Sequence, residues 1–329
     1  MVTFGVWPGV VDRDLVRLET FIDVPPEDAA RTTTALRELA GAAERFYVRS
    51  YRGYDIDGLA RPATPVSLAP YVGEGRVADL VAGYSSSEAD PDGYARWAAA
   101  CVREVAELGG GKVQVCEELN VGLPLDGGRP GCFDAFAAGL VAALDERDRL
   151  GADVLVGFNA AVTMPGDPFW STVRAHAHEE TLARIDFVGL DFFPDVFRPV
   201  PAEGLRDAVR FVLRTFRESA TGIGIPARVP LHVTETGWPT GPEHSEERQA
   251  QVLGEVAGAV LELAAELNVD TYELFGLRDG NSSGPRMNRF GLLHDDYTAK
   301  PAFDVVRRLI ATHSPLATVS RPSTPADLR

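Results

Sequence analysis

Carboxylates follow directly after several short apolar segments of this sequence, and two of them are the strongest candidates for chemistry. Glu118 follows the segment 112–117, and Glu235 follows the segment 229–234. Two carboxyl groups can divide the work of cleaving a glycosidic bond, because one protonates the departing oxygen while the other attacks or stabilises the anomeric carbon. Aromatic residues that could stack on sugar rings lie nearby in the sequence. The residue types therefore favour glycoside chemistry.

The elements that must position these residues alternate along the chain. Short apolar runs are separated by longer stretches of helical spacing, a pattern typical of βαβ units and a parallel sheet. We expect eight strands, at residues 3–7, 45–51, 65–71, 112–117, 153–158, 185–192, 229–234 and 271–277. We expect helices at residues 26–43, 91–108, 132–150, 205–219, 245–267 and 300–311. Eight units predict an α/β fold with a single (β/α)8 TIM barrel over residues 1–312 and a weakly ordered tail over residues 313–329.

In such a barrel the functional residues lie at the carboxyl ends of the strands. On the predicted elements Glu118 ends strand four, Asp191 ends strand six and Glu235 ends strand seven. Neither a GxGxxG motif after a strand nor a GxxxxGK[ST] motif is present, which excludes the common nucleotide-binding sites. The acids are therefore expected to gather at one rim.

The sequence around these two glutamates resembles a known group of enzymes. Val-Thr-Glu235-Thr-Gly-Trp-Pro is similar to the nucleophile motif of the β-1,3-glucanase and endo-galactanase families. These belong to the clan of retaining (β/α)8-barrel glycoside hydrolases with the acid/base on strand four and the nucleophile on strand seven. Val-Gln-Val-Cys-Glu-Glu118-Leu-Asn resembles the strand-four motif of the clan, and residues 291–303 resemble its closing segment. The resemblance covers residues 1–312.

The resemblance implies a role for each matching residue. Glu118 would be the general acid/base, Glu235 the nucleophile, and Arg49 on strand two the arginine that supports the nucleophile. It also implies a β-linked substrate, with no metal and no cofactor. Arg49 could instead be a structural arginine that satisfies barrel carbonyls.

The strand-four motif departs from the clan pattern. Glu117 stands where an asparagine usually contacts the sugar 2-hydroxyl, Leu119 replaces a proline, and Cys116 replaces an aromatic residue. A carboxylate can pair with a protonated amine. Glu117 therefore suggests an amino sugar or another cationic substrate, whose binding the rim acid Asp191 would also favour.

Aromatic residues complete the set of expected substrate contacts. Trp238 could be a sugar-stacking platform or could merely cap the barrel, and Trp7 has the same two interpretations. Phe192 and Phe193 cannot both face the same side of a strand, because side chains alternate. We expect one to lie in the core and include Phe193 among the substrate-binding candidates.

Other polar residues are given structural interpretations. His232 lies within a strand and is expected to be a satisfied core histidine. The spacing of His176 and His178 is compatible with a metal site, but solvent exposure is the preferred interpretation. Arg278 and Asp279 are expected to form an ion pair at the rim.

Composition excludes some partners. The net charge is −16, from 32 Lys and Arg against 48 Asp and Glu, so we expect neither nucleic acid nor an anionic membrane as a partner. The N-terminus contains no recognisable secretory signal. The three cysteines, Cys101, Cys116 and Cys132, fit reduced thiols better than disulfides. We therefore expect a cytoplasmic protein of undetermined oligomeric state.

Three other functions use the same features. A transglycosidase would employ the same glutamate pair but exclude water from the second step. A catalytically silent carbohydrate-binding barrel would explain the degenerate strand-four motif, and a lyase would use the acids as bases. The sequence leaves the sugar, the linkage and exo or endo action open. Expected loops at residues 72–91 and 120–130 could wall off one end of the cleft and favour short substrates.

Overall fold

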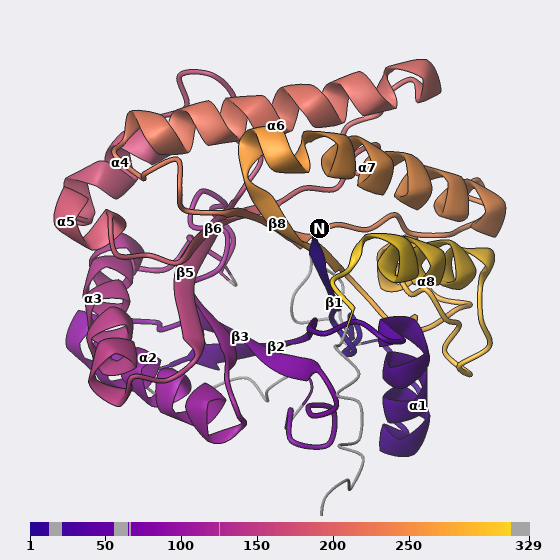
Figure 1. The fold of residues 1–329 in the computed structure, drawn as a ribbon, viewed down its shortest axis with the longest axis horizontal. Coiled ribbons are helices and arrows are strands. Elements are labelled where there is room, and N and C mark those ends of the chain that lie inside the picture. The colour runs from indigo at the N-terminus through magenta and orange to yellow at the C-terminus, as the bar shows by residue number, and fades with distance from the viewer. Residues whose placement is uncertain (13–21, 56–64, 66, 125, 317–329) are drawn as a thin grey trace, which may run out of the picture.

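The protein is a closed barrel of eight parallel strands surrounded by helices (Figure 1). The computed structural model describes residues 1–12, 22–55, 65, 67–124 and 126–316. The strands pair in chain order, and β8 closes the barrel against β1. They are β1 (Thr3–Val6), β2 (Phe46–Tyr54), β3 (Arg76–Tyr84), β4 (Gly111–Val115), β5 (Val154–Ala161), β6 (Phe187–Asp191), β7 (Leu231–Glu235) and β8 (Val269–Leu274). The predicted (β/α)8 barrel is confirmed.

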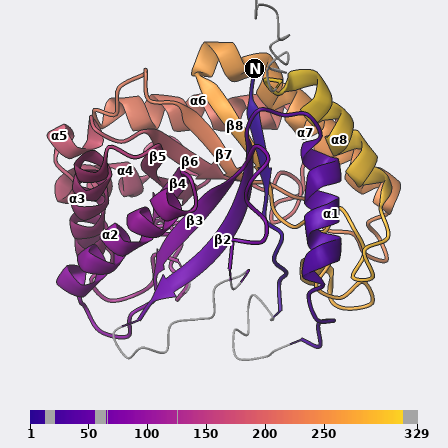
Figure 2. The same cartoon turned by 60° about the horizontal axis from the view of Figure 1, so that its bottom comes forward.

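Helices follow the strands and form the outer layer, as the view in Figure 2 shows from the side. They are α1 (Ala29–Ala40), α2 (Pro91–Glu107), α3 (Cys132–Leu150), α4 (Pro168–His176), α5 (Glu179–Leu182), α6 (Leu205–Gly222), α7 (Glu246–Leu267) and α8 (Pro301–His313), with short 3-10 turns at Ala202–Gly204 and Arg286–Asn288. Between β2 and β3, the described part of the chain contains no helix. Helix α8 packs beside both α1 and α7.

Local sequence explains where the predicted helices begin and end. The Asp90 side chain caps α2 by accepting from the backbone N–H of Gly93, and Pro91 occupies the first turn, where its missing N–H costs nothing. Ser245 caps α7 by accepting from Arg248. Asn268 ends α7 in the left-handed conformation, which asparagine tolerates better than most residues.

Strand three is not where the sequence predicted it. Residues 65 and 68–71 form bends and turns, with the Tyr71 N–H bonded to the Leu68 carbonyl, while residue 66 lies outside the described part. Leu68 and Tyr71 are buried, so their apolar character reflects core packing without a strand. The true strand, β3, contains the charged residue Asp79, which the barrel interior accommodates. The prediction of a loop at residues 72–91 is also wrong, because β3 occupies residues 76–84 of this segment.

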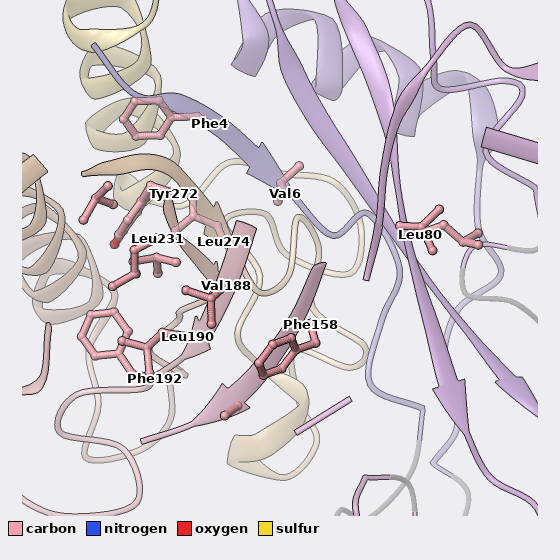
Figure 3. Close-up of a cluster of buried hydrophobic side chains, with 14 of the residues drawn as sticks. Phe4, Val6, Leu80, Phe158, Val188, Leu190, Phe192, Leu231, Tyr272 and Leu274 are labelled. Atoms are coloured by element: carbon pink, nitrogen blue, oxygen red, sulfur yellow. The ribbon is translucent and has the colours of Figure 1, made fainter. Parts of the chain in front are cut away.

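Side chains alternate between two environments along the strands. The cluster in Figure 3 is apolar, and its labelled members are Phe4, Val6, Leu80, Phe158, Val188, Leu190, Phe192, Leu231, Tyr272 and Leu274. The alternate positions include Lys112 of β4 and Glu273 of β8, which are hydrogen-bonded although their strands are not neighbours. Such a contact crosses the interior of the barrel. The interior therefore contains ionisable side chains, whereas the outward faces of the strands are apolar.

The cysteine expectation is confirmed, because Cys101, Cys116 and Cys132 are buried free thiols. The described helices include none with the length and apolar character needed to span a bilayer.

Candidate functional site

The carboxyl ends of five strands bring polar side chains together at one end of the barrel. Strand β2 supplies Arg49 and Tyr51, and the segment after β4 supplies Glu117 and Glu118. Asn159, Asp191 and Glu235 come from β5, β6 and β7. In a parallel barrel these ends all face the same side. The structure thus places both expected catalytic glutamates in the same acidic group.

Glu235 receives donors from two residues of β2. The Tyr51 hydroxyl donates to Glu235 Oε1, and Arg49 Nη2 donates to the same oxygen at 3.4 Å. Burial and the charge of Glu117 raise the pKa of Glu235 to about 8, whereas Arg49 and the Tyr51 hydrogen bond oppose this rise. Among the acids of this group, Glu235 is thus the one with both a guanidinium and a hydroxyl as donors.

Arg49 is buried and held by side chains. Its Nη1 donates to Asp79 Oδ2 at 2.8 Å, its Nε donates to the Tyr51 hydroxyl at 2.8 Å, and its Nη2 donates to Gln114 Oε1 at 3.0 Å. Arg49 thus donates to side chains and not, as the structural interpretation of this arginine had assumed, to backbone carbonyls. The guanidinium is instead fixed between the barrel interior and Glu235.

Glu117 points into the same cluster. It accepts hydrogen bonds from Gln114 Nε2 at 2.7 Å and Asn159 Nδ2 at 3.1 Å, and it lies 3.7 Å from Arg49 Nη2. Burial raises its pKa, with Arg49 opposing the rise. Glu117 therefore lies near Glu235 and is hydrogen-bonded to side chains of β4 and β5.

Glu118 follows Glu117 in a strained segment. Its φ of 32° and the φ of 63° at Cys116 are unusual for residues other than glycine. The Glu118 N–H donates to Asn159 Oδ1 at 2.9 Å. Burial, followed by the charges of Glu235 and Glu117, raises the pKa of Glu118 well above its ordinary value. A carboxyl group whose pKa is raised is suited to act as a general acid.

Asp191 is buried and lies beside Glu235, its register partner across β6 and β7. It accepts hydrogen bonds from Thr234 Oγ1 at 2.6 Å and from Asn159 Nδ2. Burial and the charge of Glu235 raise its pKa well above the ordinary value. Oxygen atoms of Glu117, Asp191 and Glu235 lie within 4.8 Å of one another, and a hard divalent cation could use such ligands. Each of the three also accepts hydrogen bonds from protein donors.

The expected aromatic contacts separate into two groups. Trp7 stacks on Phe275 at 4.6 Å and meets Tyr51 edge-on at 5.2 Å, so it adjoins the residue that contacts Glu235. Phe193 also meets Phe275 edge-on, at 5.6 Å. Trp238 is only 3% exposed, and His244 covers its ring at 4.5 Å. This position fits the barrel-capping interpretation of Trp238 better than that of an open sugar platform.

Several supporting residues were not singled out from the sequence, chiefly Tyr51, Asn159, Gln114 and Thr234. Tyr51 lies two residues after Arg49 and so shares its face of β2, which the period of a strand could have revealed. Asn159 contacts Glu117, Glu118 and Asp191 together, and this depends on strand pairing that the sequence did not disclose.

The structural interpretations had mixed outcomes. His232 is a buried core histidine, as expected, with Nε2 2.8 Å from Asp270 and Nδ1 3.5 Å from Lys112 Nζ. The Arg278–Asp279 ion pair is wrong. Asp279 instead pairs with Lys300 at 2.7 Å, and Arg278 donates to backbone carbonyls. Phe192 packs in the core, which confirms that one of the two phenylalanines does so (Figure 3).

Known proteins resemble the chain in structure. No family model and no curated protein matches the sequence. A glucosidase from Croceicoccus marinus matches with a TM-score of 0.60 and 15% identity over 94% of this chain and 67% of its own. A β-glucuronidase from an uncultured Clostridium matches with a TM-score of 0.58 and 12% identity over 94% of this chain and 50% of its own.

A third similar structure is an active-site mutant of the Rhizomucor miehei β-1,3-glucanosyltransferase in complex with laminaritriose. Its TM-score is 0.58 and its identity 15%, over 91% of this chain and 96% of its own. The chain spans about half the length of the glucuronidase and nearly all of the glucanosyltransferase. What these proteins share with the chain is the barrel fold, and as named they are glycosidases and a glycosyl transferase.

Proposed function

We propose that this protein is a retaining glycoside hydrolase that cleaves a β-glycosidic bond by double displacement. The observation that carries the proposal is the convergence of Arg49 and Tyr51 on Glu235, in the same acidic group as Glu118. These donors oppose the rise in the pKa of Glu235 and so favour the ionised form that a nucleophile needs, while burial and the neighbouring charges favour the protonated form of Glu118. The fold neighbours named as glycosidases support the same class of reaction.

The proposed mechanism gives each glutamate a distinct role. Glu235 attacks the anomeric carbon while protonated Glu118 donates its proton to the departing oxygen, which leaves a glycosyl-enzyme ester on Glu235. Glu118 then removes a proton from water as that water attacks the ester carbon. This route expects the two carboxyl groups to lie about 5 Å apart. Arg49 and Tyr51 stabilise Glu235 when it departs as a carboxylate.

We further propose that the substrate carries a positive charge near the reacting sugar. Four carboxyl groups, those of Glu117, Glu118, Asp191 and Glu235, meet Arg49 as their shared cationic neighbour. The protonated amine of an amino sugar would be a second cation beside these groups and would stabilise their ionised forms. Glu117 occupies the position that the clan resemblance assigns to the contact with the sugar 2-position.

The sugar preference can be tested with matched aryl glycosides. We expect a 2-amino-2-deoxy glycoside to have a higher kcat/KM than its N-acetylated and 2-hydroxy counterparts. Glu117→Asn should abolish or reverse this preference, because it removes the carboxylate. Equal or lower turnover of the amino sugar would refute the charge preference without affecting the proposed reaction.

The reaction itself is tested by stereochemistry and chemical rescue. Proton NMR of the first product should show a retained anomeric configuration. Glu235→Ala should be inactive, and added azide should restore cleavage and give a glycosyl azide of inverted configuration. With Glu118→Ala, azide should instead give a retained glycosyl azide. Glu38→Ala, an exposed acid on α1, serves as the control. An inverted first product would exclude double displacement.

Transglycosylation by the same pair is the second candidate, which the fold likeness to the glucanosyltransferase favours. In this case the sugar of the glycosyl-enzyme passes to another sugar hydroxyl. Products longer than the substrate at high substrate concentration would identify it. A carbohydrate-binding barrel without activity would bind sugars in calorimetry, and neither glutamate variant would change a catalytic rate.

A further inference from the structure

A second group of ionisable residues lies inside the barrel, beneath Arg49. Asp79 of β3, Lys112 of β4 and Glu273 of β8 all have fully buried side chains. Lys112 Nζ donates to Glu273 Oε1 and lies 3.7 Å from Asp79 Oδ2. Its ammonium also lies over the Tyr47 ring, 4.5 Å from the centroid. None of these residues takes part in the mechanism proposed above.

One oxygen atom of each acid has no donor. Asp79 Oδ2 accepts from Arg49, and Glu273 Oε1 accepts from Lys112, but Asp79 Oδ1 and Glu273 Oε2 have no hydrogen-bond partner as carboxylate oxygens. Leaving two buried acceptors unsatisfied would be costly. The two carboxyl groups, however, lie within hydrogen-bonding reach of each other.

The surroundings of Glu273 Oε2 are closed. An added Cβ on Gly5 of β1 would lie 2.7 Å from this oxygen, so the barrel wall approaches it closely. The charged and titratable groups around the pair are Tyr47 and Arg49 on β2, Lys112 on β4, His232 on β7 and Asp270 on β8. Lys112 is the cation next to both acids, whereas Arg49 also faces Glu235 and Glu117.

We propose that Glu273 is a protonated, neutral carboxylic acid in the folded protein and that it donates its proton from Oε2 to Asp79 Oδ1. This hydrogen bond satisfies both unpartnered oxygens at once. The pair then carries one negative charge, which Lys112 balances. The positive charge of Arg49 remains available to Glu235 and Glu117, and Asp79 acts as a positioning residue that anchors Arg49.

The electrostatic environment is consistent with this arrangement. Burial and the charge of Asp79 raise the pKa of Glu273 to about 8. Burial would also raise the pKa of Asp79, but Lys112 and Arg49 outweigh it and lower that pKa below its ordinary value. The proton therefore belongs to Glu273. The inference does not depend on the proposed glycosidase activity.

Glu273→Gln tests the proposal because a glutamine amide reproduces the proposed hydrogen bonds. Its Oε1 can accept from Lys112 and its Nε2 can donate to Asp79 Oδ1. In infrared difference spectra at pH 6, we expect the variant to lose the C=O stretch of a protonated carboxyl group. The control is Glu146→Gln, because two arginines hold the pKa of Glu146 at about 2. That control should lose carboxylate bands instead.

Thermal unfolding gives a second readout. At pH 4 Glu273→Gln should unfold within about 2 °C of the wild type, because Glu273 is then mostly neutral in the unfolded chain as well as in the folded protein. The raised pKa means that the wild type loses stability as pH rises from the ordinary range of a glutamate, about 4 to 5, to about 8. The variant should therefore gain stability relative to the wild type between pH 4 and pH 8. Loss of a carboxylate band, or failure of Glu273→Gln to fold at pH 6, would overturn the proposal.

Discussion

At the residue scale, the pH response of the site depends on which carboxyl group releases its proton first. The pKa of Glu235 is raised to about 8, and the pKa of Glu118 lies well above its ordinary value. Since kcat/KM reports the free enzyme, it should rise with pH through about 8 as Glu235 ionises. Glu117→Gln removes a negative charge that raises this pKa, so the acid limb should move to lower pH. A wild-type acid limb near pH 4 to 5, the range of an ordinary glutamate, would contradict this prediction.

The opposite shift is expected when the donor from Tyr51 is lost. Tyr51→Phe removes a hydrogen bond that lowers the pKa of Glu235, so the acid limb of the kcat/KM profile should move to higher pH. A hydrogen bond to a charged group contributes about 1.5 to 3 kcal/mol, and kcat/KM should therefore fall roughly 10- to 100-fold. An unchanged profile in Tyr51→Phe would show that Tyr51 does not act on Glu235.

At the element scale, Arg217 of α6 connects three neighbouring segments. It donates from Nε and Nη2 to the Leu267 carbonyl at the end of α7 and from Nη1 to the Val229 carbonyl before β7. It is buried, so no water replaces these donors when it is removed. We expect Arg217→Met to lower the free energy of unfolding by about 3 kcal/mol, measured by urea denaturation.

Arg214 of the same helix is the matched control. Its ion pair with Glu266 is about half exposed on both sides, and such surface pairs contribute less than about 1 kcal/mol. Arg214→Met should therefore be nearly neutral. If the two variants lost equal stability, the carbonyl contacts of Arg217 would not explain its effect.

At the scale of the whole molecule, the two ends of the described chain meet. The Val2 N–H donates to the His313 carbonyl at 3.1 Å, and the Glu44 N–H donates to the Pro315 carbonyl at 2.8 Å. Leu316 also forms an isolated antiparallel β-bridge with Ala43. A chain that ends at residue 312 should be less stable than one that ends at residue 316, by about 2 kcal/mol for the two hydrogen bonds. Equal midpoints of thermal unfolding would show that these contacts add nothing.

The sequence by itself determined the order of the elements and the residues at their ends. Apolar periodicity predicted seven of the strands at or near their positions, because outward strand faces must pack against helices. It also placed Glu118 after β4 and Glu235 at the end of β7. It failed at β3, where Asp79 interrupts the apolar pattern, and Leu68 and Tyr71 form a turn in the core instead of a strand.

Only the tertiary structure decided which charges share the barrel interior. Asp79, Lys112 and Glu273 lie far apart in the sequence and meet because closure of the barrel directs alternate side chains of β3, β4 and β8 to one axis. The donors of Glu235 likewise come from β2, far from β7 in the sequence. These two strands come close together because β8 pairs with β1 and closes the barrel. Sequence patterns specify which face a residue occupies, but the protonation of a buried acid depends on neighbours that closure selects.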